Sequence, residues 1–339
     1  MAEGYDAFHM GRCSIDLYSD DIGADFADIT RFSAYVGGSP TNISVGARRL
    51  GLKTALLTAV GDDPVGSFIL SFLRREGVET AHIPAKEGRR TPAVLLGIQP
   101  PDRFPLVYYR ENCADGDLSI EDVPIDEVST SRVFQFAGTN LSLEPSRSAT
   151  VFAAEVARRA GRTVVFDLDL RADQWRDIRF FGAAARDTMR VVDVVLGNAD
   201  ELKGAVAERA TDASVTHSQV SDAHVEGDSS AAVETILGLG PSVVLEKVGD
   251  RGARVHERVV GEIRVTEAPG FPVDVVNVLG AGDAFGAGLI YGHVQGWSWQ
   301  KAARLGNACG AIVVTRHGCA NFMPTLQEAM DLADRHGGL

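Results

Sequence analysis

The chain has 339 residues, of which 45% are hydrophobic and 23% charged, a globular composition whose length suits two domains or one large α/β domain. Its formal net charge is -13. Such an acidic surface repels phosphate backbones, so we expect no nucleic-acid partner, and an anionic substrate would need a local cationic pocket.

Neither the cysteines nor the hydropathy indicates secretion or a membrane. The four cysteines are scattered without a CxxC pair, which predicts free thiols in a reducing compartment. The N-terminal sequence MAEGYDAFHMGR lacks the basic start and apolar core of a signal peptide. No stretch reaches the roughly 18 apolar residues of a membrane-spanning helix. We therefore expect a cytoplasmic protein with no membrane contact.

Short apolar, β-branched runs alternate with amphipathic segments along the chain. The runs are almost continuously apolar, which predicts strands buried on both faces, as in a parallel sheet covered by helices. Repetition of strand and helix indicates a doubly wound α/β fold within one domain, 1–339. The runs that we expect to form strands are 54–60, 132–138, 163–169, 191–197 and 242–248.

Proline marks the start of three predicted helices. Ser39 and Asp63 are N-cap candidates that each precede a proline at the first helical position. Gly77 is placed to close the second helix. The third helix is expected to start at Glu144-Pro145 and to end near Gly161.

Two regions depart from this rhythm. In residues 12–36 and 89–112 polar and aromatic residues alternate, which predicts a small, half-exposed sheet. We expect this sheet to be a lid over the main domain or a dimer contact, so a homodimer through the lid is one expected assembly. Residues 208–231 are rich in Ser, Asp and His with little to bury, which predicts a polar surface loop.

The most informative stretch is a glycine-rich turn that runs into an apolar helix, Gly280-Ala281-Gly282-Asp283. Such a turn points several unpaired N–H groups at one place, and the helix dipole adds roughly 0.3–1 kcal/mol for a nearby anion. An anion hole beside a carboxylate base is what phosphoryl transfer to an alcohol requires. An Asp at a helix start, with glycines used for close packing, would look the same.

Four further positions follow, or lie at, the ends of apolar runs: Gly138, Asp169, Asn198 and Lys247. Parallel α/β sheets build their sites at the carboxyl ends of the strands. Chance turn residues are the alternative explanation, but the agreement in location favours one shared site.

Five motifs and their order along the chain resemble those of the ribokinase-like (PfkB) carbohydrate kinase family, and the resemblance covers nearly the whole chain. The resemblance implies a ribokinase-like fold, in which GAGD supplies the anion hole and Asp283 the base. The five segments similar to family signatures are 37–42 (GG), 61–66 (G-x-D-x-x-G), 198–201 (N-x-x-E), 247–252 (K-x-G-x-x-G) and 280–283.

The same resemblance implies ATP and Mg²⁺ as cofactors. Asn198 and Glu201 would hold the metal ion, largely through water. The residues that would lie near the nucleotide are Asn198, Lys247, Gly249, Gly252 and Asn307.

Within the family, the chain is most similar to the 5-dehydro-2-deoxygluconokinases of inositol catabolism. The similar segments include 109–115, 167–175 and 306–325. The similarity implies ATP-dependent phosphorylation of the C6 hydroxyl of 5-dehydro-2-deoxy-D-gluconate. Before GAGD, Asn277 and Val278 stand where most relatives have Asp-Thr, which puts a monovalent-cation site in question.

The substrate residues follow partly from the resemblance and partly from charge. By resemblance, Asp16 at the end of the first strand would accept hydrogen bonds from sugar hydroxyls, Gly38 would allow close approach and Asn42 would bond a hydroxyl. A sugar acid also needs an arginine, because a bidentate arginine–carboxylate contact neutralises it economically. The candidates for that contact are Arg110, after two tyrosines, and Arg171, after Asp169.

Two kinds of alternative stay open at this point. One is another kinase of the same family, a 2-keto-3-deoxygluconokinase or a fructokinase. The other is a non-catalytic, sugar-binding regulatory protein on a kinase scaffold, against which the intact Asp283 and its glycine turn argue.

Overall fold

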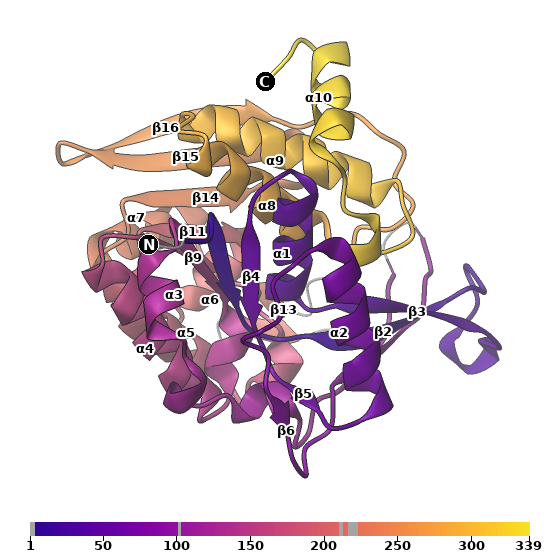
Figure 1. The fold of residues 1–339 in the computed structure, drawn as a ribbon. Coiled ribbons are helices and arrows are strands. Elements are labelled where there is room, and N and C mark those ends of the chain that lie inside the picture. Colours follow the sequence, from indigo (N-terminus) through magenta and orange to yellow (C-terminus); the bar gives the residue numbers. More distant parts are fainter. Residues whose placement is uncertain (1–3, 101–102, 210–212, 216–222) are drawn as a thin grey trace.

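The computed structural model describes residues 4–100, 103–209, 213–215 and 223–339, which are organised around an eight-stranded sheet (Figure 1). Its order is β16-β15-β14-β11-β10-β9-β1-β4. The strands from β14 to β4 pair in parallel, whereas β15 and β16 add an antiparallel hairpin at one edge. The strands are β1 (Ala7–Met10), β4 (Thr54–Leu57), β9 (Val133–Ala137), β10 (Thr163–Asp167), β11 (Val194–Asn198), β14 (Val243–Lys247), β15 (Gly252–Val259) and β16 (Glu262–Pro269).

The predicted doubly wound, mostly parallel sheet is confirmed, and all five predicted strands belong to it. The sequence did not reveal β1 or the β15–β16 hairpin. β1 has only four residues, and β16 is exposed along most of its length, so neither shows a long apolar run. β16 is the edge strand, which carries many polar side chains and lacks the signature of a buried parallel strand, whereas β1 is a buried inner strand that is too short to show it.

Side chains that alternate along the strands supply two hydrophobic layers, one on each face of the sheet. Phe134 and Phe166 contribute to the layer under α3 to α7, whereas Val133 and Val165 contribute to the layer under α1, α8, α9 and α10. The helices are α1 (Ser39–Arg49), α2 (Pro64–Glu76), α3 (Ile125–Thr130), α4 (Ser146–Arg159), α5 (Ile178–Thr188), α6 (Ala199–Ala205), α7 (Ser229–Leu239), α8 (Ala281–Val294), α9 (Trp299–Val314) and α10 (Leu326–Arg335).

One of the predicted helix starts needs correction. Asp63 caps α2 by accepting from the Gly66 N–H, and Gly77 ends that helix in the left-handed conformation, as predicted. Ser39, however, is the first residue of α1 and not its N-cap, a position that Gly38 takes. The Ser39 hydroxyl instead donates to Asp167 at the end of β10. The Ser39 side chain therefore binds a carboxylate at the end of β10 instead of capping α1.

A second, four-stranded sheet projects from the body of the molecule, as the β2–β3 region in Figure 1 shows. It forms from the two segments in which polar and aromatic residues alternate. Asp16 lies within this sheet, on β2, and not at the end of the first strand as the sequence suggested. The strands, in spatial order, are β3 (Phe32–Gly37), β2 (Ser14–Ser19), β7 (Ala93–Leu96) and β8 (Leu106–Tyr109).

Two short strand pairs lie outside these sheets. β5 (Val60–Gly61) pairs with β6 (Ala85–Lys86), and β12 (Ala213–Val215) pairs with β13 (Ala223–Val225). The second pair lies within the predicted polar loop, of which residues 210–212 and 216–222 are outside the described residues. In the part of the chain that the structure describes, no helix combines the length and apolarity needed to cross a bilayer. All four cysteines are free and buried.

Candidate active site

The carboxyl ends of β10, β11 and β14 bring a charged cluster together. Lys247, at the end of β14, places its Nζ 3.4 Å from Asp167 Oδ1 and 3.4 Å from Glu201 Oε2. Burial raises the pKa of Asp167 to about 7, against the opposing charge of Lys247. The pKa of Lys247 itself is raised by the surrounding carboxylates, which outweigh its burial. The lysine is therefore a fixed positive charge at the sheet edge.

The glycine turn places Asp283 over this edge. Gly280 has φ +80° and precedes α8 without a side-chain cap, so the first N–H groups of the helix are not satisfied by a capping side chain. Asp283 lies in the first turn, where its Oδ2 accepts from Asn42 Nδ2 at 2.7 Å. Burial, and next the charge of Asp169, raise the pKa of Asp283. A carboxylate and backbone N–H groups that lack a side-chain cap thus share one end of α8, although the Ala281 N–H donates to the Val278 carbonyl at 3.4 Å.

Two cavities meet at this turn. The smaller, of about 40 Å³, is lined by Gly280 and Asp283, and the larger, of about 590 Å³, is lined by Ala281 and Gly282. The small cavity lies beneath the four-stranded sheet, with residues of β2, β7 and β8 in its wall. A group bound in one cavity can therefore reach a group bound in the other across the N-terminus of α8.

Four of the predicted substrate residues line the small cavity: Asp16, Gly38, Asn42 and Arg171. Burial raises the pKa of Asp16 to about 6, although the nearby charge of Arg12 opposes the shift. Arg171 donates from Nε to Asp169 Oδ1 at 2.9 Å, so Asp169 acts behind the arginine. Arg171 and the other cationic neighbours outweigh burial and lower the pKa of Asp169.

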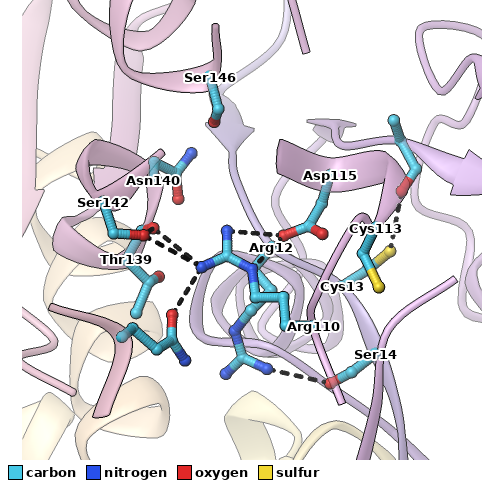
Figure 2. Close-up of polar contacts among 12 residues, drawn as sticks. Arg12, Cys13, Ser14, Arg110, Cys113, Asp115, Thr139, Asn140, Ser142 and Ser146 are labelled. Atoms are coloured by element: carbon cyan, nitrogen blue, oxygen red, sulfur yellow. Dashed lines mark hydrogen bonds and ion pairs between the residues drawn. The ribbon is translucent and has the colours of Figure 1, made fainter. Parts of the chain in front are cut away.

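Arg110, in contrast, is not in the wall of either cavity. Its Nε and Nη2 both donate to Asp115 Oδ2 at 2.8 Å. Its Nη1 contacts the Thr139 carbonyl, the Ser142 hydroxyl and Gln174 Oε1. Figure 2 shows Asp115, Thr139 and Ser142 around the guanidinium. The expectation that Arg110 meets a substrate carboxylate is therefore corrected, because its donors are committed to protein acceptors.

Two residues of the site were not found from the sequence. Arg12 lines the small cavity, and Asp167 accepts from Ser39 and faces Lys247. Arg12 follows β1, the strand too short to be recognised, so its position near a strand end was hidden. Asp167 was counted as part of a strand that the sequence extended to residue 169, whereas β10 ends at Asp167 itself.

The large cavity is lined by four of the five residues predicted to lie near a nucleotide, and Asn198 is not in its wall. Lys247, Gly249, Gly252 and Asn307 all line it. Asn307 is oriented by donating to the carbonyls of Ala268 and Pro269. The remaining wall is mostly apolar, as is typical of pockets that hold a flat heterocycle. Its apolar side chains are Phe271, Pro272, Val273, Val275, Val278, Phe285, Ala311 and Val314.

Asn198 and Glu201 form a reciprocal capping box at the start of α6. Asn198 Oδ1 accepts from the Glu201 N–H, and Glu201 Oε2 accepts from the Asn198 N–H. Among the described residues, no three His, Cys, Asp or Glu side chains converge as a direct metal cage. This donor set fits Mg²⁺, which usually keeps several waters and takes its other ligands from one or two carboxylates and from substrate phosphates.

Fold and site together define a phosphotransferase of the ribokinase type, and the comparisons with known proteins agree. Residues 7–326 match the pfkB family carbohydrate kinase model, and the chain belongs to that family. It is 33% identical over 336 residues to the 5-dehydro-2-deoxygluconokinase of Geobacillus kaustophilus (strain HTA426), covering 98% of this chain and 94% of the relative. The protein of that name from Bacillus subtilis (strain 168) is 29% identical, covering 98% of this chain and 97% of the relative.

The fold has counterparts among solved structures. The fructokinase of Xylella fastidiosa with bound ATP superposes with a TM-score of 0.83 at 22% identity, covering 98% of this chain and 99% of that one. An E. coli protein assigned as Ribokinase II, in complex with ATP and Mg²⁺, gives the same TM-score, identity and coverage. These likenesses confirm the ribokinase-like fold.

Proposed function

We propose that this carbohydrate kinase transfers the terminal phosphoryl group of ATP to the C6 hydroxyl of 5-dehydro-2-deoxy-D-gluconate. Two full-length relatives with that activity in their names are 33% and 34% identical to this chain. The observation that carries the proposal is the position of Asp283. It is a buried carboxylate held by Asn42, at the helix N-terminus where an acceptor cavity meets a nucleotide cavity.

In the proposed reaction, the acceptor sugar occupies the small cavity and ATP the large one. Asp283 accepts the proton of the C6 hydroxyl as that oxygen attacks the terminal phosphorus, which contributes about 10²–10⁴-fold to the rate. The N–H groups of the turn formed by Gly280, Ala281 and Gly282 stabilise the charge of the transferred group, where each donor is typically worth about 2.7–4 kcal/mol. Lys247 adds a positive charge from the sheet edge.

Two further parts of the chain assist that transfer. Mg²⁺, ordered through water by Asn198 and Glu201, would neutralise the phosphate charge. The four-stranded sheet acts as the lid that covers the acceptor and excludes water. We also propose that the protein acts in the cytoplasm and that it forms a homodimer through the lid.

A coupled assay of ADP release tests this function. We expect the highest kcat/KM with 5-dehydro-2-deoxygluconate, against 2-keto-3-deoxygluconate, gluconate and fructose as acceptors. Phosphate on C6 of the product is checked by NMR. Higher activity on 2-keto-3-deoxygluconate or fructose would replace the proposed substrate and leave the kinase assignment intact. Tight sugar binding without ADP release from any acceptor would favour the non-catalytic alternative.

A further inference from the structure

Two arginines, Arg12 and Arg110, are buried, and their environments differ sharply (Figure 2). Arg12 is 5% exposed and Arg110 is 8% exposed. Arg110 has a full set of acceptors, including the carboxylate of Asp115. Among the described residues, by contrast, no carboxylate lies within ion-pair distance of Arg12, and its one side-chain hydrogen bond goes from Nη1 to Ser14 Oγ at 3.2 Å.

A buried guanidinium whose N–H donors lack acceptors is costly. The group carries five N–H donors and stays charged in proteins. Buried Nε of Arg12 has no acceptor, and the side chain lines the small cavity. Since buried charges are paired in nearly all native structures, the cavity beside Arg12 is suited to an anion that supplies the absent acceptors.

The surroundings hold Arg12 in place for such a contact. Its carbonyl accepts from the Thr41 hydroxyl at 2.9 Å. A Cβ on Gly38 would approach the same carbonyl to 2.3 Å, so the glycine lets α1 pack directly against it. The guanidinium lies 5.1 Å from the centroid of the Tyr108 ring, on the lid strand β8. Cation–π contact of this kind orders a guanidinium without satisfying its N–H donors.

Ser14 connects Arg12 to the hydroxyl-binding side of the cavity. Its hydroxyl accepts from Arg12 and donates to Asp16 Oδ1 at 2.6 Å. Ser14 thus orders both Arg12, which could bind a substrate carboxylate, and Asp16, which could bind sugar hydroxyls. The second cationic residue in the wall, Arg171, already forms an ion pair with Asp169 at 2.9 Å. Of these two arginines, Arg171 has a carboxylate at ion-pair distance, whereas no described carboxylate lies that close to Arg12.

We propose that Arg12 is the principal residue that recognises the substrate carboxylate, with Arg171 as its neighbour in the same cavity. This inference rests on the proposed function, because it takes the acceptor to be a sugar acid. It assigns selection of acids over neutral sugars to the segment between β1 and β2, where one buried guanidinium has no carboxylate within ion-pair distance among the described residues.

The test compares Arg12→Gln with Arg110→Gln, the same chemical change in the neighbouring buried arginine. For each protein, kcat/KM is measured with 5-dehydro-2-deoxygluconate and with its carboxamide, which keeps the shape and the single primary hydroxyl but removes the charge. In Arg12→Gln we expect the acid-to-amide ratio to fall roughly 10- to 100-fold, mainly through KM for the acid. Arg110→Gln is expected to keep the wild-type ratio.

Thermal unfolding without substrate separates recognition from folding. Arg12→Gln breaks no close ion pair, whereas Arg110→Gln leaves Asp115 without its partner, so we expect Arg12→Gln to lower the melting temperature less than Arg110→Gln does. Arg12→Lys is the second variant, since it keeps the charge but loses the planar fork; its ratio should lie between those of the wild type and Arg12→Gln. An unchanged acid-to-amide ratio in Arg12→Gln would overturn the assignment, whatever its melting temperature.

The same measurements distinguish this inference from the proposed function. If the wild type phosphorylates the acid and its amide equally well, Arg12 is not a carboxylate anchor although the kinase function stands. If the wild type uses another sugar acid, the proposed substrate is wrong and the ratio is measured with that acid and its amide. If only neutral sugars react, both proposals are overturned.

Discussion

The two cavities that meet at the N-terminus of α8 recognise their contents by different means. The acceptor cavity is small and lined by buried charges, among them Arg12, Asp16, Arg171 and Asp283. The nucleotide cavity is large and mostly apolar, with Lys247 and the glycines of the strand-exit turns at its polar end. Charge in a buried setting discriminates strongly, because an unmatched buried charge is costly. If the proposed function is right, acceptor choice depends on charge and protonation, whereas nucleotide binding depends more on shape and backbone.

Asp283 lines the small cavity in the helix turn where the two cavities meet, and its neutralisation should have the largest effect. We expect Asp283→Asn to lower kcat at least about 100-fold, because an amide cannot take the hydroxyl proton. The amide can still accept from Asn42, so both substrates should continue to bind. Rapid-quench turnover and calorimetric binding measure the two quantities. Near-normal turnover of Asp283→Asn would show that Asp283 is not the catalytic base.

Arg110 tests whether a buried arginine close to the acceptor cavity has only a structural role. Arg110→Gln leaves Asp115, whose side chain is 1% exposed, without its ion-pair partner. Breaking a buried pair in this way costs about 3–5 kcal/mol. Denaturant unfolding should therefore show a clear loss of stability. The double variant with Asp115→Asn should lose less than the sum of the single changes, since the two residues interact directly. Additive losses would contradict the pairing.

The pH dependence tests the buried carboxylates. Burial raises the pKa of Asp16 to about 6 and of Asp167 to about 7, and it also raises the pKa of Asp283. A raised pKa means that these groups lose their charge as the pH falls from neutral, so kcat/KM should fall on the acid side. We expect an apparent midpoint between pH 6 and 7 that belongs to the coupled group. A profile that stays flat down to pH 5 would refute this ionisation scheme.

The smallest effect is expected from monovalent cations. Asn277 Oδ1 accepts from the Leu279 N–H, and its Nδ2 donates to the His317 carbonyl at 3.4 Å. The amide is thus used within the protein and brings no negative charge to a cation. Exchanging K⁺ for tetramethylammonium at constant ionic strength should leave kcat/KM nearly unchanged. Strong activation by K⁺ would show that other oxygens replace the missing carboxylate.

Local sequence chemistry accounts for much of the scaffold. Asp63 and Gly77 bound α2 as predicted, because a cap and a left-handed glycine act on groups within one helical turn. The glycine turn before α8 also formed where the sequence placed it. The same reasoning failed at Ser39, whose hydroxyl found a better acceptor in Asp167, on a strand far along the chain. Sequence spacing carries no information about that partner.

The sequence by itself determined the doubly wound sheet, the anion-binding turn and the family, because periodicity, capping and contiguous motifs are local properties. Only the tertiary structure decided that Arg12, and not Arg110, lines the small cavity in which we propose that the acceptor binds. The Arg110 guanidinium receives acceptors from Asp115, from Thr139 and Ser142, and from Gln174. The Arg12 guanidinium contacts the Ser14 hydroxyl and the Tyr108 ring. The free energy of a buried charge depends on all the groups that surround it, and those groups come from distant parts of the chain.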